Sequence, residues 1–193
     1  MSLPQPRPGV LTLKPYVATH GKTTQQRVIK LSANEGALGP SPKAVEAYKS
    51  VAADLHRYPE GGSGTLAHAI AKKHGLDEAR VICGNGSDEL IEVIVKAFAG
   101  VGDEVIYTQY GFRMFPITTQ SLGATPVMAP EKDFHVDIEA ILEKVTERTK
   151  IVFLANPNNP TGSYNTVEEV KSLHARLPEN VVLVLDAAYA EFV

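Results

Sequence analysis

Two uninterrupted apolar runs constrain the fold of this sequence most strongly. They are IVFLA at 151–155 and VVLVL at 181–185. A strand with one solvated face alternates apolar and polar residues, whereas these runs contain no polar position, as expected of parallel strands covered on both faces. Both runs are also too short to span a bilayer. The sequence therefore predicts a buried parallel sheet.

Helical patterns alternate with these two runs and with three further apolar runs. Apolar residues recur at helical spacing over 42–55, 64–75, 87–100, 137–145 and 166–177. Asp137 can cap the fourth of these helices, and Thr166 with Glu169 forms a T-x-x-E capping box for the fifth. Strands are expected within RVICG (80–84), DEVIYT (103–108), ATPVMAP (124–130), KIVFLANP (150–157) and VVLVLD (181–186). This alternation predicts an α/β fold with a mostly parallel sheet.

Composition excludes several classes of protein. With 193 residues, 44% hydrophobic and 21% charged, the chain resembles an ordinary soluble domain. A net charge of −3 with scattered basic residues predicts no nucleic-acid or membrane partner. The single cysteine, Cys83, fits the reducing cytoplasm, and the six histidines lack metal-ligand spacing, so we expect no metal site. Three prolines within residues 1–9 predict an extended arm.

Ligands of such sheets bind at the carboxyl ends of the strands. The segments that follow the predicted strands are GNGSDE (84–89), QYGF (109–112), NPNNPTG (156–162) and DAAY (186–189). GNGSDE, opening a helix, is typical of a phosphate site, or else is a tight turn capped by Ser87 or Asp88. NPNNPTG is either a rigid loop that aims an asparagine amide over the sheet edge or an ordinary turn.

Asp186 and Phe112 each allow two interpretations. An unpaired carboxylate at the end of a buried strand costs roughly 2–7 kcal/mol or more, so Asp186 is expected to face a positive partner. The alternatives are a helix cap or, less favoured, a metal ligand. Phe112 is either a flat aromatic wall of a site or a core residue.

Together these segments supply a phosphate cradle, a flat aromatic ring, an amide and a carboxylate. At this point the sequence resembles the fold-type I pyridoxal-phosphate enzymes, and in particular the histidinol-phosphate aminotransferases. The resemblance implies a three-layer α/β/α large domain like that of aspartate aminotransferase. The blocks that carry it are LKPY (13–16), LSANEGALGPSP (31–42), RYPEG (57–61), GNGSDE, NPNNPTG and DAAYAEF (186–192).

The resemblance also assigns roles to residues at matching positions. Gly86, Ser87 and Asp88 would hold the phosphate of pyridoxal 5'-phosphate, with Ser87 and Asp88 donating backbone N–H groups. Phe112 would stack on the pyridine ring, while Asn159 and Tyr189 would bind its phenolic oxygen. Asp186 would face the pyridine nitrogen and keep it protonated. The remaining assignments are Tyr58 toward the cofactor of the neighbouring subunit and Tyr16 and Asn34 on the substrate side.

The implied reaction is transamination between a small amino donor and a 2-oxo acid, in a cytoplasmic homodimer. The family's Schiff-base lysine follows the aspartate in a Ser-Lys context, but this chain has no lysine after Lys171. We therefore expect the sequence to be the N-terminal half of a longer enzyme and inactive alone. Residues 1–36 would form the arm and part of a small domain, and residues 37–193 the first part of the large domain.

The sequence allows several alternative functions. A dinucleotide-binding enzyme is disfavoured because Glu89 stands where G-x-G-x-x-G needs its third glycine, and a P-loop because Tyr16 occupies the first-glycine position of the HGKTT segment. A non-catalytic module that binds the cofactor without a lysine is a further alternative. Within the fold, aromatic amino acid aminotransferase and threonine-phosphate decarboxylase are the nearest alternatives.

Overall fold

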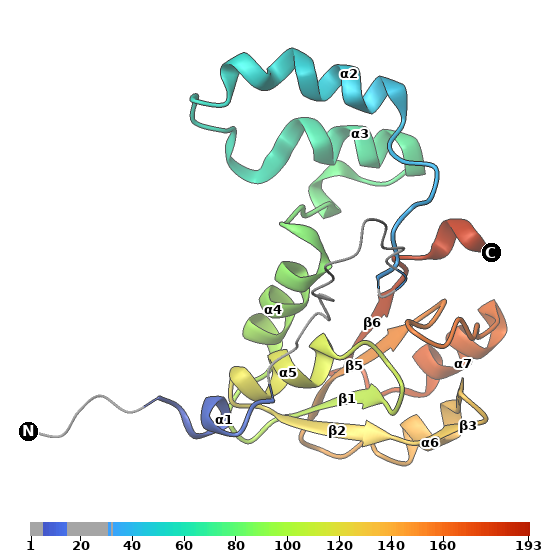
Figure 1. Cartoon of the computed structure of the whole chain (residues 1–193). Coiled ribbons are helices and arrows are strands. Elements are labelled where there is room, and N and C mark those ends of the chain that lie inside the picture. Colours follow the sequence, from blue (N-terminus) through green and yellow to red (C-terminus); the bar gives the residue numbers. More distant parts are fainter. Residues whose placement is uncertain (1–5, 15–30, 32) are drawn as a thin grey trace, which may run out of the picture. The chain divides into compact units, whose positions relative to one another are not determined.

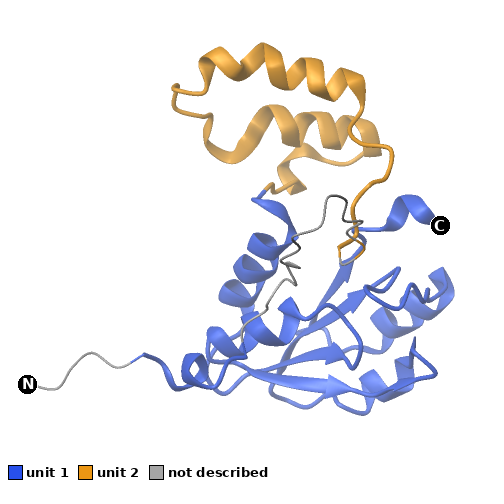
Figure 2. Ribbon diagram, in the orientation of Figure 1, with its two compact units in different colours: residues 1–16, 84–193 blue, residues 17–83 orange. Residues whose placement is uncertain are grey.

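In the computed structural model, which describes residues 6–14, 31 and 33–193, the chain divides into two compact units (Figure 2). Unit 1 contains residues 1–16 and 84–193, and unit 2 contains residues 17–83. The boundary predicted at residue 36 concerned the domains of a longer protein and stays a prediction.

Unit 2 is helical in its described part. Its helices are α2 (Pro42–Val51) and α3 (Gly64–His74), with short 3-10 turns η1 (Ala52–Asp54), η2 (Gly61–Ser63) and η3 (Glu78–Arg80). Both long helices were predicted. The left-handed Gly75 (φ 66°) ends α3, as glycine commonly does at a helix C-terminus.

Unit 1 is built on a four-stranded, fully parallel sheet with strand order β2-β1-β5-β6 (Figure 1). The strands are β1 (Glu104–Thr108), β2 (Thr125–Ala129), β5 (Thr149–Ala155) and β6 (Val182–Asp186), and β3 (Glu131–Lys132) with β4 (His135–Val136) forms a separate antiparallel hairpin. The helical elements are α1 (Pro8–Leu11), α4 (Gly86–Phe98), α5 (Met114–Ser121), α6 (Ile138–Leu142), α7 (Val167–Arg176) and the turn η4 (Ala190–Phe192).

Central strand β5 explains why its sequence is apolar throughout. Ile151, Phe153 and Ala155 belong to one buried cluster, which includes residues of α4 and α5. Val152 and Leu154 belong to a second cluster, which includes residues of α6 and α7. Successive side chains of a strand point to opposite faces, so both faces of β5 are covered. The predicted three-layer α/β/α arrangement is confirmed.

The predicted helix caps are also confirmed. The carboxylate of Asp137 accepts the backbone N–H groups of Glu139 and Ala140 at the start of α6. Thr166 and Glu169 form the reciprocal capping box of α7. These interactions depend on neighbours in sequence, which is why the sequence alone predicts them.

Three predictions about local structure were wrong. VVLVL is not covered on both faces in this chain: it forms the edge strand β6, which is only partly buried, with Leu185 45% exposed. RVICG forms no strand: Val81 is extended (φ −105°, ψ 119°), but among the described residues none pairs with it, and Ile82 is 75% exposed. The proline-rich arm is not extended throughout, because Pro8–Leu11 makes one helical turn with proline at its start, where the fixed φ of proline suits a helix. Thr12 in this segment accepts a hydrogen bond from Gln120 of α5 at 2.6 Å.

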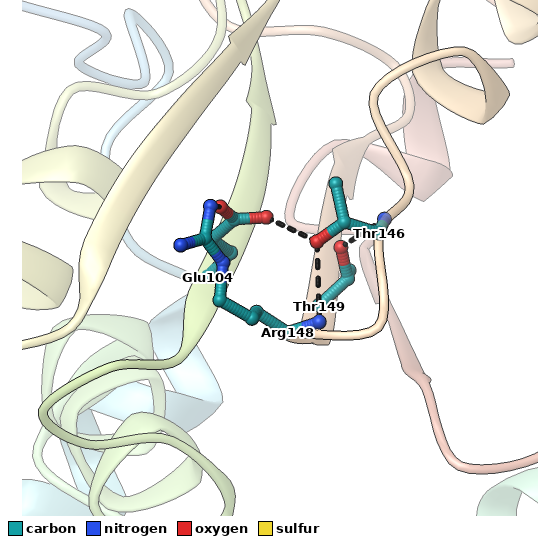
Figure 3. Close-up of polar contacts among 4 residues, drawn as sticks. All are labelled: Glu104, Thr146, Arg148 and Thr149. Atoms are coloured by element: carbon teal, nitrogen blue, oxygen red, sulfur yellow. Dashed lines mark hydrogen bonds and ion pairs between the residues drawn. The ribbon is translucent and has the colours of Figure 1, made fainter.

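The amino end of β1 carries a buried carboxylate, Glu104, with partners from the 146–149 turn (Figure 3). The Glu104 side chain is only 7% exposed; one of its oxygens accepts the Thr146 hydroxyl at 2.6 Å and the other accepts the guanidinium of Arg148. The backbone N–H of Arg148 in turn donates to the Thr146 hydroxyl at 3.1 Å. Because a buried charge needs partners, these contacts tie the 146–149 turn to β1 at the edge of the sheet opposite the carboxyl ends.

Candidate active site

The carboxyl ends of β1, β5 and β6 meet at one edge of the sheet. β5 lies between the other two and all three run parallel, so the residues after each strand come together. Phe112 lies in the segment after β1, Asn159 in the segment after β5, and Asp186 is the last residue of β6. The chain passes from β1 to β2 on one side and continues with β5 on the other side of β1, which is the kind of switch point where open α/β sheets bind ligands.

A cavity of about 160 Å³ lies at this edge. It brings together five of the predicted site residues from four separate segments of unit 1. Its lining residues are Ser87, Phe112, Ala155, Pro157, Asn159, Asp186, Ala188 and Tyr189. Gly86 and Asp88 flank Ser87 in the chain without lining the cavity.

Two backbone contacts hold Asp186 in the cavity wall, one with β5 and one with the residues that follow it. Its residue pairs with Ala155 as the last pair of the β5–β6 ladder. One oxygen of its half-buried carboxylate accepts the N–H of Ala188 at 3.2 Å. Asp186 is not a helix cap, because Tyr189 is the N-cap of η4; its carboxylate instead closes a turn with Ala188 and also lines the cavity. No group of three or more potential metal ligands is found in residues 6–14, 31 and 33–193.

Phe112 serves both the core and the cavity. Its ring contacts Phe115 edge-to-face with centroids 5.7 Å apart, and it packs against the core cluster of α4 and α5. The preceding Gly111 lets the chain pass close to Thr108 on its way to Phe112. A Cβ at position 111 would lie only 2.6 Å from the Thr108 hydroxyl. Only glycine lets the segment fold back so tightly over the end of β1.

The start of α4 offers free hydrogen-bond donors. The helix begins at Gly86, whose φ of 79° suits glycine, so Ser87 and Asp88 lie in the first turn and neither is the cap. Glu89 accepts the N–H of Asn85, whereas the N–H groups of Ser87 and Asp88 have no acceptor among the described residues. Free N–H groups at the positive end of a helix dipole can hold an anion.

The NPNNPTG loop is fixed by buried asparagines that the sequence analysis did not single out. Asn156, Asn158 and Asn165 are 8%, 4% and 1% exposed. Asn156 and Asn165 exchange two hydrogen bonds, from the Asn156 amide to the Asn165 carbonyl at 2.9 Å and from the Asn165 N–H to the Asn156 amide oxygen at 2.8 Å. The signal available in the sequence was the density of asparagine directly after a buried strand, since buried amides need partners.

Three further predicted residues are not assigned to this cavity. Tyr16 lies outside the described residues. Asn34 and Tyr58 belong to unit 2, and the Tyr58 side chain is fully solvated at 98% exposure in this chain. Their predicted roles stay predictions.

A parallel α/β sheet brings an aromatic ring, an amide, a carboxylate and a residue of a helix N-terminus around one cavity. The sequence profile of the aminotransferases of class I and II matches residues 26–193, and the chain belongs to this family.

Relatives within the family share one name. The chain is 53% identical to the histidinol-phosphate aminotransferase of Rhodospirillum centenum and 52% identical to that of Paramagnetospirillum magneticum, in each case over its whole length. It spans about half of these relatives, 54% and 53% of their length.

A solved structure extends the comparison to three dimensions. The histidinol-phosphate aminotransferase of Sinorhizobium meliloti, in complex with pyridoxal-5'-phosphate, superposes with a TM-score of 0.79 at 34% identity. The match covers 82% of this chain and 44% of that one.

No helix within residues 6–14, 31 and 33–193 combines the length and hydrophobicity needed to cross a membrane.

Proposed function

We propose that the protein carrying this sequence is a pyridoxal-phosphate-dependent histidinol-phosphate aminotransferase. The observation that carries the proposal is that Ser87, Phe112, Asn159, Asp186 and Tyr189 line one cavity. The family match and the relatives' shared name support the activity. The substrates would be histidinol phosphate and 2-oxoglutarate, giving imidazole-acetol phosphate and glutamate in histidine biosynthesis.

The chemistry of the lining residues fits this cofactor. The cofactor carries a phosphate, a pyridine nitrogen, a phenolic oxygen and a flat ring. The free N–H groups of Ser87 and Asp88 suit the phosphate, and the positive φ of Gly86 allows the turn that exposes them. The Asn159 amide and Tyr189 hydroxyl are donors suited to the phenolic oxygen. When bound, the cofactor supplies an electron sink for the loss of a proton next to the substrate nitrogen.

Asp186 is proposed to hold a proton on the pyridine nitrogen. A carboxylate close to a basic nitrogen stabilises the protonated form, because the opposite charges attract more strongly where water is scarce. The backbone ladder and the Ala188 N–H fix this carboxylate, so it needs no rearrangement to act. Phe112, supported by its contact with Phe115, would stack on the pyridine ring of the cofactor.

The remaining proposals concern assembly and location. We propose a cytoplasmic homodimer in which Tyr58 contributes to the partner's cofactor site and Tyr16 and Asn34 lie on the substrate side. Residues 1–36 would belong to the arm and small domain and residues 37–193 to the large domain. Light scattering with size-exclusion chromatography tests the dimer, and a monomer that retains full activity would contradict it.

The experiment that tests the function has two stages. The first is an absorbance titration of the purified protein with pyridoxal phosphate. Binding requires a saturable change in the spectrum, whether or not a band above 400 nm appears. The second compares rates with histidinol phosphate, phenylalanine and threonine phosphate as substrates. The proposal expects the highest kcat/KM with histidinol phosphate.

The other outcomes separate the alternatives. Preference for phenylalanine would indicate an aromatic aminotransferase, and carbon dioxide released from threonine phosphate would indicate a decarboxylase. Cofactor that binds to the full-length protein but is not fixed to it by borohydride would indicate a non-catalytic module. The chain of 193 residues alone, with no lysine after Lys171, is predicted to bind the cofactor without transaminating.

A further inference from the structure

Asn158 connects two loops that each contribute a residue to the cavity wall. Its side-chain amide nitrogen donates to the hydroxyl of Thr161 at 2.8 Å and to the backbone carbonyl of Tyr110 at 3.3 Å. Tyr110 lies two residues before Phe112, whereas Asn158 lies directly before Asn159. The bond to Tyr110 therefore joins segments 48 residues apart, each of which carries one lining residue of the cavity.

Asn158 is itself held firmly enough to act as a fixed point. Its backbone N–H donates to the Ser163 carbonyl at 2.9 Å, and its carbonyl accepts the N–H of Gly162 at 2.8 Å. The hydroxyls of Thr161 and Ser163 lie 2.8 Å apart, so a side-chain hydrogen bond adds to the two backbone bonds of this turn. These contacts leave the Asn158 side chain little freedom to follow a moving loop.

Tyr110 is held from a second direction as well. Its backbone N–H donates to the Glu131 carboxylate at 3.0 Å, while its carbonyl accepts from Asn158. The residue that leads into Phe112 is thus fixed at both of its backbone polar groups. Loss of the Asn158 bond would leave the Tyr110 carbonyl without its partner.

An asparagine at this buried position is less favourable than an apolar side chain of the same size would be. The side chain is 4% exposed, and its amide oxygen has no partner in the part of the chain that the structure describes. A buried unpaired oxygen costs free energy that an apolar side chain would avoid. The hydrogen bonds of this side chain are made through its amide nitrogen, which has two acceptors.

We propose that Asn158 is a positioning residue that sets the placement of Phe112 relative to Asn159. The proposal rests on the proposed function in that those two residues are taken to contact the cofactor. Asn158 touches neither substrate nor cofactor and acts through the Tyr110 carbonyl.

Asn158→Ala tests the proposal against a matched control, Asn165→Ala. Asn165 is also buried, and its amide nitrogen likewise donates to a backbone carbonyl of another segment, that of Val136 at 3.2 Å. Only the Asn158 bond reaches the Phe112 loop. Amide hydrogen exchange in the cofactor-free protein, read on the peptide covering 109–113, reports the loop directly. We expect exchange there to rise at least threefold in Asn158→Ala and to stay unchanged in Asn165→Ala.

Cofactor affinity provides the second readout. The dissociation constant for pyridoxal phosphate is expected to rise about tenfold in Asn158→Ala, the size expected for one lost hydrogen bond, and much less in Asn165→Ala. Thr161→Val, which keeps its shape but removes one acceptor of the Asn158 amide, should shift both readouts in the same direction by a smaller amount. If Asn158→Ala does not fold, Asn158→Leu, which removes the amide nitrogen but keeps a similar side-chain volume, is read by the same two measurements.

Unchanged exchange over 109–113 in Asn158→Ala, or an equal rise in Asn165→Ala, would overturn the positioning role. In folded variants, raised exchange with an unchanged dissociation constant would overturn it too, because the loop would then move without affecting the ligand. If the wild-type protein binds no pyridoxal phosphate, the proposed function fails, and the exchange comparison alone still decides whether Asn158 positions the Phe112 loop.

Discussion

The backbone N–H of Asn156 donates to the backbone carbonyl of Asp186 at 2.9 Å. This bond continues the ladder between β5 and β6 beyond its last residue pair, Ala155 with Asp186. The residue that carries the site's carboxylate is therefore fixed by main-chain contacts that do not involve its side chain. Substitutions at Asp186 can change the charge in the cavity while leaving the sheet edge in place.

We predict that Asp186→Ala nearly abolishes turnover of the intact enzyme without unfolding it. Loss of one partner of a hydrogen-bonded charge pair typically costs about 2–5 kcal/mol, which corresponds to a fall in kcat of roughly 30-fold to 5,000-fold. Steady-state kinetics and circular dichroism check the two halves of this prediction. Glu191→Ala, which removes an exposed acid five residues away, should keep normal rates. Retained activity in Asp186→Ala would reject the proposed role.

Phe112 is predicted to contribute to cofactor affinity through its flat ring. Phe112→Leu keeps apolar contact with Phe115 but removes the aromatic face, so we expect the dissociation constant for pyridoxal phosphate to rise roughly fivefold to tenfold. Phe112→Tyr keeps the face and should bind nearly as the wild type does. Absorbance titration measures both variants. Equal affinity in Phe112→Leu and wild type would show that the ring does not stack on the cofactor.

Glu104 and Glu139 form a matched pair for testing the value of burial. Each accepts a guanidinium, Glu104 from Arg148 and Glu139 from Arg176, but their side chains are 7% and 64% exposed. Glu104→Gln is expected to lower the free energy of unfolding by about 1–3 kcal/mol, since hydrogen bonds to buried charged groups are among the stronger ones. Glu139→Gln should have a much smaller effect, because solvent screens an exposed pair. Urea unfolding of both variants checks the contrast, which an equal loss would contradict.

The capping box of α7 predicts a pH-dependent contribution to stability. Backbone and hydroxyl hydrogen bonds from Thr166 hold the pKa of Glu169 below its usual value of 4.5. Because the folded-state pKa is depressed, the stabilisation is complete above the unfolded-state pKa and is lost as the pH falls through the folded-state pKa. The stability difference between wild type and Glu169→Gln should therefore be full at pH 7 and shrink below pH 4.5.

Thr166→Ala removes the other half of the same box. Loss of a threonine N-cap typically costs about 1 kcal/mol, so we expect a fall of that size in the free energy of unfolding at pH 7. Chemical denaturation measures it. Ser172→Ala on the same helix keeps the cap intact and serves as the control; an equal loss in that variant would show that the cap is not the cause.

The sequence was a good guide wherever structure depends on near neighbours. The five predicted helices and four of the five predicted strands are present, because apolar periodicity and caps such as Asp137 act within a few residues. Helix α5 was missed because MFPITTQS contains a proline and β-branched residues that weaken a helical pattern. The β3–β4 hairpin was missed because strands of two residues carry no periodicity.

The amino-acid order by itself determined which side chains follow each strand, and so which chemical groups reach the ligand-binding edge. It could not determine that β5 lies between β1 and β6, nor that the Asn158 amide reaches the Tyr110 carbonyl. Strand order is decided by covering both faces of the sheet at once, and the Asn158 bond by the need to pair buried polar groups. Both conditions involve residues far apart in the chain, so only the folded molecule satisfies them.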